Sequence, residues 1–273
     1  MAACTEGTTP HKVFWLLEIL SYCAVDAFAL ISGYTATDKM RKFEKLADMW
    51  FQAFFYSFVI TAILTIAGLN PEWNVKGLIK SALPVTFGVF WYFTAFFALF
   101  FAIPVLNRFV FAVDEKAARR AILLLMTLFS GMELLAGAFN TQGGYSALWL
   151  MVLYCVGVLA KQGRVFERRH SLTLIAVWIV CVLITWFVQV FIGSGRLTSY
   201  VSPTIVASGL IMVILFSRLR LKGTVVEKLS PLVFGIYLFQ LNPVIWNTCL
   251  QGRASFAAQA GIAAGVRYVF AIA

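Results

Sequence analysis

The chain has 273 residues, of which 61% are hydrophobic and 12% are charged, and its formal net charge is +10. In soluble domains about a quarter of the residues are charged, so this composition excludes a soluble protein and indicates an integral membrane protein. Its apolar segments run without interruption for roughly 17 to 25 residues, the length of a membrane-spanning helix, and do not alternate as the strands of a barrel do. We therefore expect an all-α fold, a polytopic helix bundle embedded in a membrane.

Nine membrane spans are predicted, in one membrane-embedded domain that covers residues 1–273. In chain order the spans are about 13–36, 46–68, 87–106, 121–139, 145–160, 171–193, 204–217, 231–250 and 257–273. The first twelve residues lack the basic start and apolar core of a signal peptide, and the chain stops inside an apolar run. We therefore expect a chain truncated at both ends, with a tenth span upstream of Met1.

The loops differ in their content of Lys and Arg, which predicts the orientation of the spans. Sixteen of these cations fall in the loops after spans one, three, five and seven, and five fall in the opposite set. The N-terminus of this chain is therefore predicted to lie outside and the C-terminus in the cytoplasm. Because the cations lie where an anionic leaflet attracts them, and no nucleic-acid-binding motif is present, nucleic acid is not expected as a partner.

The sequence has no pattern typical of a metal or nucleotide site. Its five cysteines have no paired spacing, and its two histidines, His11 and His170, stand apart from other ligands. Phosphate-binding glycine loops and the Gly-x-Ser-x-Gly pattern of serine hydrolases are also missing from the sequence. We expect neither a bound metal nor a bound cofactor.

Ionisable side chains inside the predicted spans are the first functional candidates, because a charge within the bilayer is costly. Glu18, Tyr22 and Asp26 recur every four residues and therefore share one side of the first span. A further carboxylate, Glu133, lies in the fourth span. These carboxylates could share a proton, hold a basic group or orient a catalytic base. Alternatively, they only form hydrogen bonds between helices or lie nearer the membrane interface.

Four stretches together resemble the acyltransferase-3 family, and they occur in the order found in that family. The first is AVDAFALISGY (24–34), and the second is WYFTAFFALFFAIPVLN (91–107). The third is GGYSALWLMVLYCVGVLAK (143–161), and the fourth is LSPLVFGIYLFQLNPVIWN (229–247). Together these stretches extend over nearly the whole chain.

This resemblance implies about ten membrane helices and an O-acyltransferase of a bacterial cytoplasmic membrane. Members of the family transfer an acyl group, often acetyl, from acyl-coenzyme A to a hydroxyl of a cell-surface saccharide or related acceptor. Acyl-coenzyme A is then the co-substrate on the cytoplasmic side, and membrane lipid surrounds the bundle. The acyl group, the acceptor and the oligomeric state are left open.

The resemblance also implies roles for particular residues. The family's first helix, with its Arg and its catalytic His, is missing here, and Gln240 replaces a late histidine of the family. Asp26 is the candidate that would orient the missing base, and Gly33 is expected to allow close backbone approach beside Tyr34. The candidates for substrate binding are Ser32, Tyr34, Trp91, Tyr237, Gln240 and Asn242, and those for the donor phosphates are Lys39, Arg41 and Lys42.

Two other interpretations remain open. Glu18, Asp26 and Glu133 inside the bundle would also suit a transporter or exporter of a small solute or glycan. The chain could also be an inactive fragment of a longer protein. The three cations proposed for the donor phosphates could serve only to set the topology.

Overall fold

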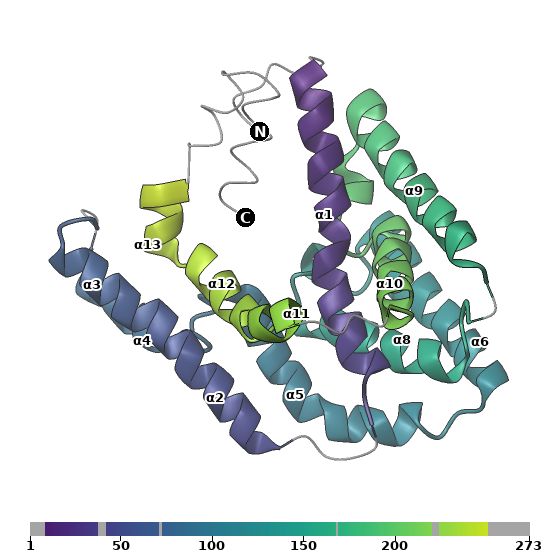
Figure 1. The fold of residues 1–273 in the computed structure, drawn as a ribbon, viewed down its shortest axis with the longest axis horizontal. Coiled ribbons are helices and arrows are strands. Elements are labelled where there is room, and N and C mark those ends of the chain that lie inside the picture. The colour runs from purple at the N-terminus through teal and green to yellow at the C-terminus, as the bar shows by residue number, and fades with distance from the viewer. Residues whose placement is uncertain (1–8, 38–41, 71–72, 168, 220–223, 251–273) are drawn as a thin grey trace. The chain divides into compact units, whose positions relative to one another are not determined.

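The computed structural model describes residues 9–37, 42–70, 73–167, 169–219 and 224–250, and these residues form helices and no strand (Figure 1). The predicted all-α fold is therefore confirmed. Five helical segments are long and apolar enough to cross a membrane, and Ala147–Gln162 is a shorter apolar helix. The five are His11–Tyr34, Phe43–Ile66, Trp91–Val110, Ser171–Ile192 and Gly195–Ser217. The chain is a polytopic helical membrane protein, as its composition predicts.

The chain divides into two compact units, each built from segments that are far apart in the sequence. Unit 1 is formed mainly by residues 41–97 and 221–273, and unit 2 by residues 12–40 and 98–220. The long helix α5 (Trp91–Val110) contributes residues to both units.

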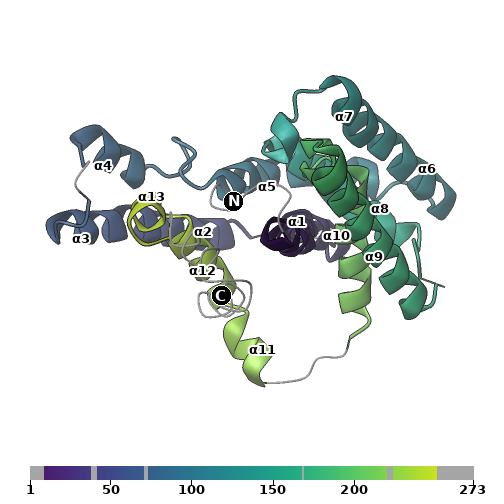
Figure 2. The same cartoon turned by 90° about the horizontal axis from the view of Figure 1, so that it is seen from above.

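Unit 2 is a helix bundle in which α9 packs on α10 and α6 packs on α8 (Figure 2). Its longer helices are α1 (Thr9–Tyr34), α6 (Glu115–Met126), α8 (Ala147–Gln162), α9 (Ser171–Phe187) and α10 (Pro203–Ser217). The shorter elements are η2 (Thr127–Met132), α7 (Glu133–Ala136), η3 (Gln142–Gly144), η4 (Val188–Ile192) and η5 (Gly195–Thr198). The predicted fourth span, 121–139, overlaps the uninterrupted helical segment α6–η2–α7, which begins and ends a few residues earlier than predicted.

The ends of these helices follow local sequence signals. The Asp114 side chain caps α6 by accepting a hydrogen bond of 2.7 Å from the Ala117 N–H. Ser146 caps α8 in the same way, and Pro203 occupies the first turn of α10, where a missing N–H costs nothing. The α6–α7 segment ends at Gly137, whose φ of +62° suits glycine.

Unit 1 contains α2 (Phe43–Phe54), η1 (Phe55–Val59) and α3 (Ile60–Ile66), which run on from one another, followed by α4 (Val75–Ala82) and the start of α5. Its later part contains α11 (Thr224–Leu229), α12 (Leu232–Gln240), α13 (Pro243–Ile245) and η6 (Trp246–Leu250). The buried core of the unit consists of Ala53, Phe90, Phe93 and Leu238. This core joins α2, α5 and α12, because its residues come from all three helices or, for Phe90, from the position just before α5.

Two further predicted spans differ from the structure. The predicted span 231–250 is interrupted, since α12 ends at Gln240 and α13 begins at Pro243. Proline has no N–H to continue the hydrogen-bond ladder, and Asn242 caps the new helix. The third predicted span starts later, at Trp91, and continues through Pro104 to Val110. The predicted ninth span, 257–273, lies outside the described residues.

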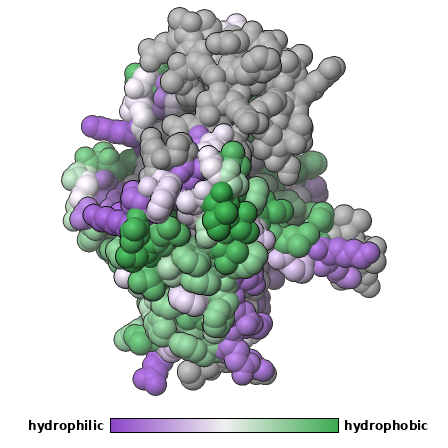
Figure 3. All heavy atoms as spheres, turned by 90° about the vertical axis from the view of Figure 1, so that its left-hand side faces the viewer, coloured by the Kyte–Doolittle hydropathy of each residue, from purple (hydrophilic) through white to green (hydrophobic). Residues whose placement is uncertain are grey.

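Apolar side chains cover much of the surface of unit 1. Figure 3 looks toward the side where α2, η1 and α3 run and shows a broad apolar area with hydrophilic side chains at its margins. Phe43, Phe51, Phe55, Ile63 and Ile66 are more than half exposed along this helical segment. A soluble protein rarely exposes large apolar side chains along a whole helical segment, so this surface is suited to contact with the hydrocarbon of a membrane.

Candidate functional site

The buried carboxylate of Asp26 on α1 is the main polar feature inside unit 2. Asp26 is 1% exposed, and its Oδ1 accepts a hydrogen bond of 3.3 Å from the indole N–H of Trp149 on α8. Its other oxygen, Oδ2, is buried and has no hydrogen-bond partner among the described residues. A buried oxygen of this kind is costly until a donor satisfies it. Asp26 can therefore hold a protonated base or a hydroxyl at Oδ2 while Trp149 fixes the orientation of the carboxylate.

Two glycines bring α1 and α8 close enough for this contact. A Cβ atom on Gly33 would overlap the Tyr154 carbonyl oxygen, and one on Gly157 would overlap the Leu30 carbonyl oxygen. Both positions therefore require glycine for backbone approach, not for an unusual φ. The expected role of Gly33 is confirmed, and the structure adds Gly157 as its partner on α8.

An aromatic cluster lies on the same stripe of α1, one turn from Asp26. The ring centroid of Tyr22 is 5.3 Å from that of Tyr200, which lies 5.2 Å from that of Tyr145. Glu18, one turn further toward the N-terminus, is only partly buried. The stripe predicted from the spacing thus runs from a partly buried Glu18 to a fully buried Asp26.

The carboxylate of Glu133 is occupied by the loop that follows α7. Its Oε2 accepts a hydrogen bond of 2.7 Å from the Phe139 N–H. Its Oε1 accepts two, each of 2.7 Å, from the N–H and the hydroxyl of Thr141. Glu133 therefore holds its own loop in place, a structural role that differs from the hydrogen bonds between helices considered from the sequence.

A second buried polar pair joins α5 and α8. The Tyr154 hydroxyl donates a hydrogen bond of 2.7 Å to the Asn107 Oδ1, and both side chains are buried. Both residues lie in stretches that resemble the acyltransferase-3 family, but no sequence pattern predicts that they pair. The pair fixes α5 against the helix that carries Trp149.

In unit 1, Asn242 holds the break between α12 and α13. Its side chain is fully buried, and its Oδ1 accepts hydrogen bonds from the N–H groups of Val244 (2.9 Å) and Ile245 (3.2 Å). Its Nδ2 donates to the Tyr56 carbonyl oxygen at 2.8 Å and lies 3.3 Å from the Thr61 hydroxyl. These contacts give Asn242 a structural role, and a contact with substrate stays a prediction.

The other predicted substrate residues are distributed over both units. Tyr237 packs against the core of unit 1, with its ring centroid 6.2 Å from that of Phe90, whereas Gln240 is exposed. Trp91 is partly buried at the start of α5. In unit 2, Ser32 and Tyr34 are partly buried near the end of α1, and the ammonium of Lys161 lies 6.0 Å from the Tyr34 ring centroid.

The candidates for contacts to the donor phosphates are only partly described. Lys42 is exposed just before α2, whereas Lys39 and Arg41 lie outside the described residues. Within the part of the chain that the structure describes, no group of three His, Cys, Asp or Glu side chains could hold a metal ion.

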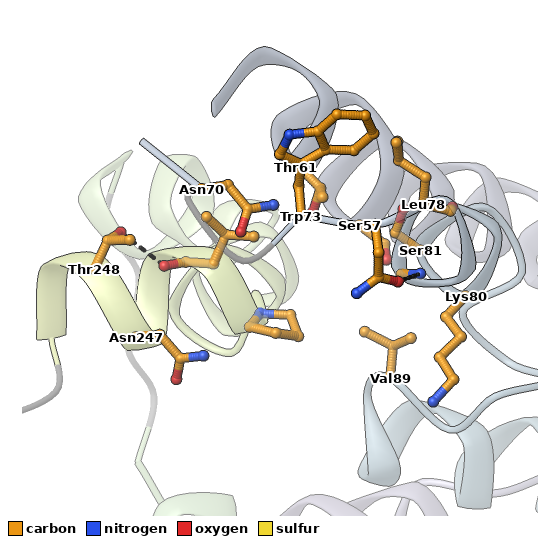
Figure 4. Close-up of a pocket in the computed structure, with 14 residues that line it drawn as sticks. Ser57, Thr61, Asn70, Trp73, Leu78, Lys80, Ser81, Val89, Asn247 and Thr248 are labelled. Atoms are coloured by element: carbon orange, nitrogen blue, oxygen red, sulfur yellow. Dashed lines mark hydrogen bonds between the residues drawn. The ribbon is translucent and has the colours of Figure 1, made fainter. Parts of the chain in front are cut away.

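Unit 1 also contains a polar cavity of about 620 Å³ (Figure 4). Figure 4 shows Asn247 and Thr248 of η6 on one side and Ser57, Thr61 and Ser81 on the other. Asn70, Asn74, Trp73 and Lys80 complete its polar and aromatic lining. The buried Ser57 hydroxyl has no hydrogen-bond partner among the described residues. Apart from the Lys80 ammonium, the polar groups of the lining are neutral donors and acceptors. Together with an indole ring, they suit a ligand that carries several hydroxyl groups.

Sequence reasoning missed Trp149, Gly157 and the whole cavity of unit 1. Trp149 and Gly157 lie in a stretch already noted for its family resemblance, so that stretch held the signal. The lining of the cavity has no such signal, because its Ser, Thr and Asn residues come from five separate elements and loops.

The comparisons with known proteins give one match. The model of the acyltransferase-3 family, described as an acyltransferase domain, matches residues 5–271. No curated protein and no solved structure matches the chain significantly. Since the family model covers nearly all of the 273 residues, the chain belongs to the acyltransferase-3 family and is a membrane acyltransferase.

Proposed function

We propose that this protein is an O-acyltransferase of a bacterial cytoplasmic membrane, which transfers an acyl group, typically acetyl, from acyl-coenzyme A to a saccharide hydroxyl. Family membership supports the transfer of an acyl group. The observation that carries the assignment of a site is the buried Asp26 carboxylate, held by Trp149 and open at Oδ2.

The chemistry explains why such a carboxylate is useful. In the reaction, the acceptor oxygen forms a bond to the acyl carbon, the carbon–sulfur bond of the thioester breaks, and the hydroxyl proton ends on the leaving thiolate. A hydroxyl is a weak nucleophile at neutral pH and needs a base to remove its proton. A buried carboxylate orients an imidazole base and stabilises its protonated form. We assign this positioning role to Asp26.

The acceptor part of the proposal is supported by the cavity of unit 1. Its lining offers hydroxyl and amide groups for hydrogen bonds to sugar hydroxyls, and the Trp73 indole offers a ring face for stacking. The loop that carries Trp73 is predicted to lie outside, where a cell-surface acceptor would arrive. On the opposite side, the exposed cation Lys42 suits the phosphates of coenzyme A.

The test is transfer of radiolabel from acetyl-coenzyme A to membrane glycans. The chain is expressed as written and also with the in-frame sequence upstream of Met1, each with Asp26→Asn, with Asp48→Asn as the matched control. Asp48 is exposed on α2 and belongs to neither candidate site. Loss of a positioned proton-transfer centre costs about 10² to 10⁴ in rate. In the form of the chain that transfers label, Asp26→Asn should therefore lower transfer by about 10²-fold or more, while Asp48→Asn leaves it unchanged.

Two outcomes would contradict the proposal. Transfer at the wild-type rate by a folded Asp26→Asn variant would remove Asp26 from the mechanism. If the glycans acquire no radiolabel and solute uptake depends on Asp26, the result would instead support a transporter. A second variant, Asn247→Ala, separates the acceptor site from the chemistry, because it should raise the KM for the glycan without lowering kcat.

A further inference from the structure

Unit 2 contains a second cavity, of about 940 Å³, whose two ends differ in chemistry. It lies along α6, α8 and α10 and reaches the loop that connects α8 to α9. One end is lined by arginine and glutamate side chains, and the remainder mainly by aliphatic ones. None of the candidate residues for acyl transfer lines it.

The charged end carries three arginines, Arg119, Arg164 and Arg169, and two carboxylates, Glu115 and Glu167. Arg119 pairs with Glu115 on the same helix, and its Nε donates a hydrogen bond of 2.7 Å to the Gly163 carbonyl oxygen. Arg164 lies 3.6 Å from Glu167, and both side chains are 62% exposed. An exposed pair of this kind contributes little free energy, so an anion can compete with Glu167 for Arg164.

A fourth arginine holds the loop that presents these cations. The two terminal nitrogens of Arg218, just after α10, donate hydrogen bonds to the carbonyl oxygens of Phe166 (2.7 Å) and Arg169 (2.9 Å). The same guanidinium donates to the Ser171 hydroxyl at 3.0 Å. The loop is therefore fixed before any ligand binds, which lowers the entropic cost of binding.

The aliphatic part of the cavity follows α6 and α10. Ile122, Leu123 and Met126 line it from α6, and Val206 and Leu210 line it from α10. Leu123 is 68% exposed, so this side of the cavity opens laterally toward the space that hydrocarbon fills around a membrane protein. From Arg119 to Met126 the helix rises about 10 Å, enough for the first part of an acyl chain.

We propose that this cavity binds an anionic phospholipid, with the phosphate at Arg164 and Arg169 and an acyl chain along α6 and α10. Basic pockets between membrane helices on the cytoplasmic side bind anionic headgroups, and the Lys and Arg distribution predicts that this end of unit 2 is cytoplasmic. Coenzyme A fits less well, because its pantetheine amides would find no polar partners among Ile122, Met126 and Val206. Inorganic phosphate would leave the aliphatic part of the cavity unused.

The site is tested by lipid binding to the purified full chain in detergent micelles, with phosphatidylglycerol and phosphatidylcholine of identical acyl chains as probes. Each cation near an anionic lipid contributes about fivefold in affinity, so the double variant Arg164→Gln, Arg169→Gln should bind phosphatidylglycerol about 25-fold more weakly. The matched control is Lys116→Gln, Arg120→Gln, two exposed cations of α6 that do not line the cavity. It should bind within about twofold of the wild-type affinity.

Two further variants separate charge from fold and headgroup from chain. Arg164→Lys, Arg169→Lys keeps the charge and should retain most of the affinity, which guards against a loss caused by misfolding. Ala207 lines the aliphatic part of the cavity. Ala207→Trp places an indole there and should weaken the binding of phosphatidylglycerol at least tenfold. Three results would overturn the proposal. The first is equal affinity for phosphatidylcholine and phosphatidylglycerol, and the second is wild-type affinity of the Arg164→Gln, Arg169→Gln variant for phosphatidylglycerol. The third is displacement of bound phosphatidylglycerol by coenzyme A or inorganic phosphate at similar concentration.

Discussion

Replacing Gly157 by alanine should destabilise unit 2, although alanine is the better helix former. Gly157 of α8 faces α1, and a Cβ atom there would overlap the Leu30 carbonyl oxygen and lie 2.9 Å from the Tyr34 nitrogen. Both neighbours are backbone atoms, which cannot rotate away as a side chain can. The two helices would therefore have to separate, and the separation would lengthen the bond between Trp149 and Asp26.

The size of the effect follows from two opposing terms. Alanine is favoured over glycine within a helix by about 1 kcal/mol. An extra methyl group in a close-packed interior costs about 1 to 3 kcal/mol, and backbone neighbours on two sides place Gly157 at the upper end of that range. We expect a net loss of about 1 to 2 kcal/mol from the free energy of unfolding.

Gly131 supplies the matched control. It also lies in a helical segment, η2, but the nearest atom to an added Cβ is the Met126 carbonyl oxygen at 3.8 Å, an ordinary van der Waals distance. Gly131→Ala should therefore be neutral or stabilising by up to about 1 kcal/mol. The two substitutions are chemically identical and are predicted to have opposite signs.

Equilibrium unfolding in mixed micelles of mild detergent and dodecyl sulfate, followed by tryptophan fluorescence, measures both variants. A double variant, Gly33→Ala with Gly157→Ala, should lose less than the sum of the single losses, because the helices separate only once. Equal stability of Gly157→Ala and Gly131→Ala would show that α1 and α8 do not pack as described. It would also contradict the placement of Asp26 beside Trp149.

Three further outcomes are expected. Asn242→Ala should lower the free energy of unfolding by about 2 to 3 kcal/mol, because it removes a helix cap and leaves the Tyr56 carbonyl oxygen without this donor; Asn247→Ala, in the adjacent cavity, should have no measurable effect. Glu133→Gln should cost about 1 to 3 kcal/mol, since an NH₂ group cannot accept the hydrogen bond of an N–H, and faster amide exchange at residues 139–141 would report it. Arg218→Lys should speed tryptic cleavage in the loop between α8 and α9 severalfold, because an ammonium cannot replace both arms of the guanidinium, whereas unchanged cleavage would show that the loop does not depend on this residue.

The candidate site could be predicted from the sequence only where a single residue is unusual in its local context. A carboxylate at position 26 inside an apolar run is costly wherever the helix packs, so Asp26 stands out from sequence alone. Glu133 has the same signal but a different outcome, because Thr141 and Phe139, a few residues later in the chain, fold back onto it. Hydropathy cannot distinguish the Asp26 carboxylate, which has an oxygen without a donor, from the Glu133 carboxylate, which accepts three hydrogen bonds.

The break at Asn242 and Pro243 was open to prediction and was missed. Both residues are printed in the sequence, and the pair is a strong signal for a new helix start. The prediction of one span over 231–250 followed hydropathy instead, since the residues before and after this pair are together apolar enough to form a single span. In the structure the hydrogen-bond ladder stops at Pro243, which has no N–H. The buried Asn242 side chain then accepts hydrogen bonds from two N–H groups at the start of α13.

The sequence by itself determined that this protein is an all-α membrane protein, because segment length and hydropathy are local quantities that add along the chain. It also determined the family, through short patterns in a fixed order. Only the tertiary structure decided what Asp26 contacts, since Trp149 lies 123 positions away along the chain. The polar cavity of unit 1 and the two-sided cavity of unit 2 depend in the same way on distances in space, which helix packing sets and which no single segment encodes.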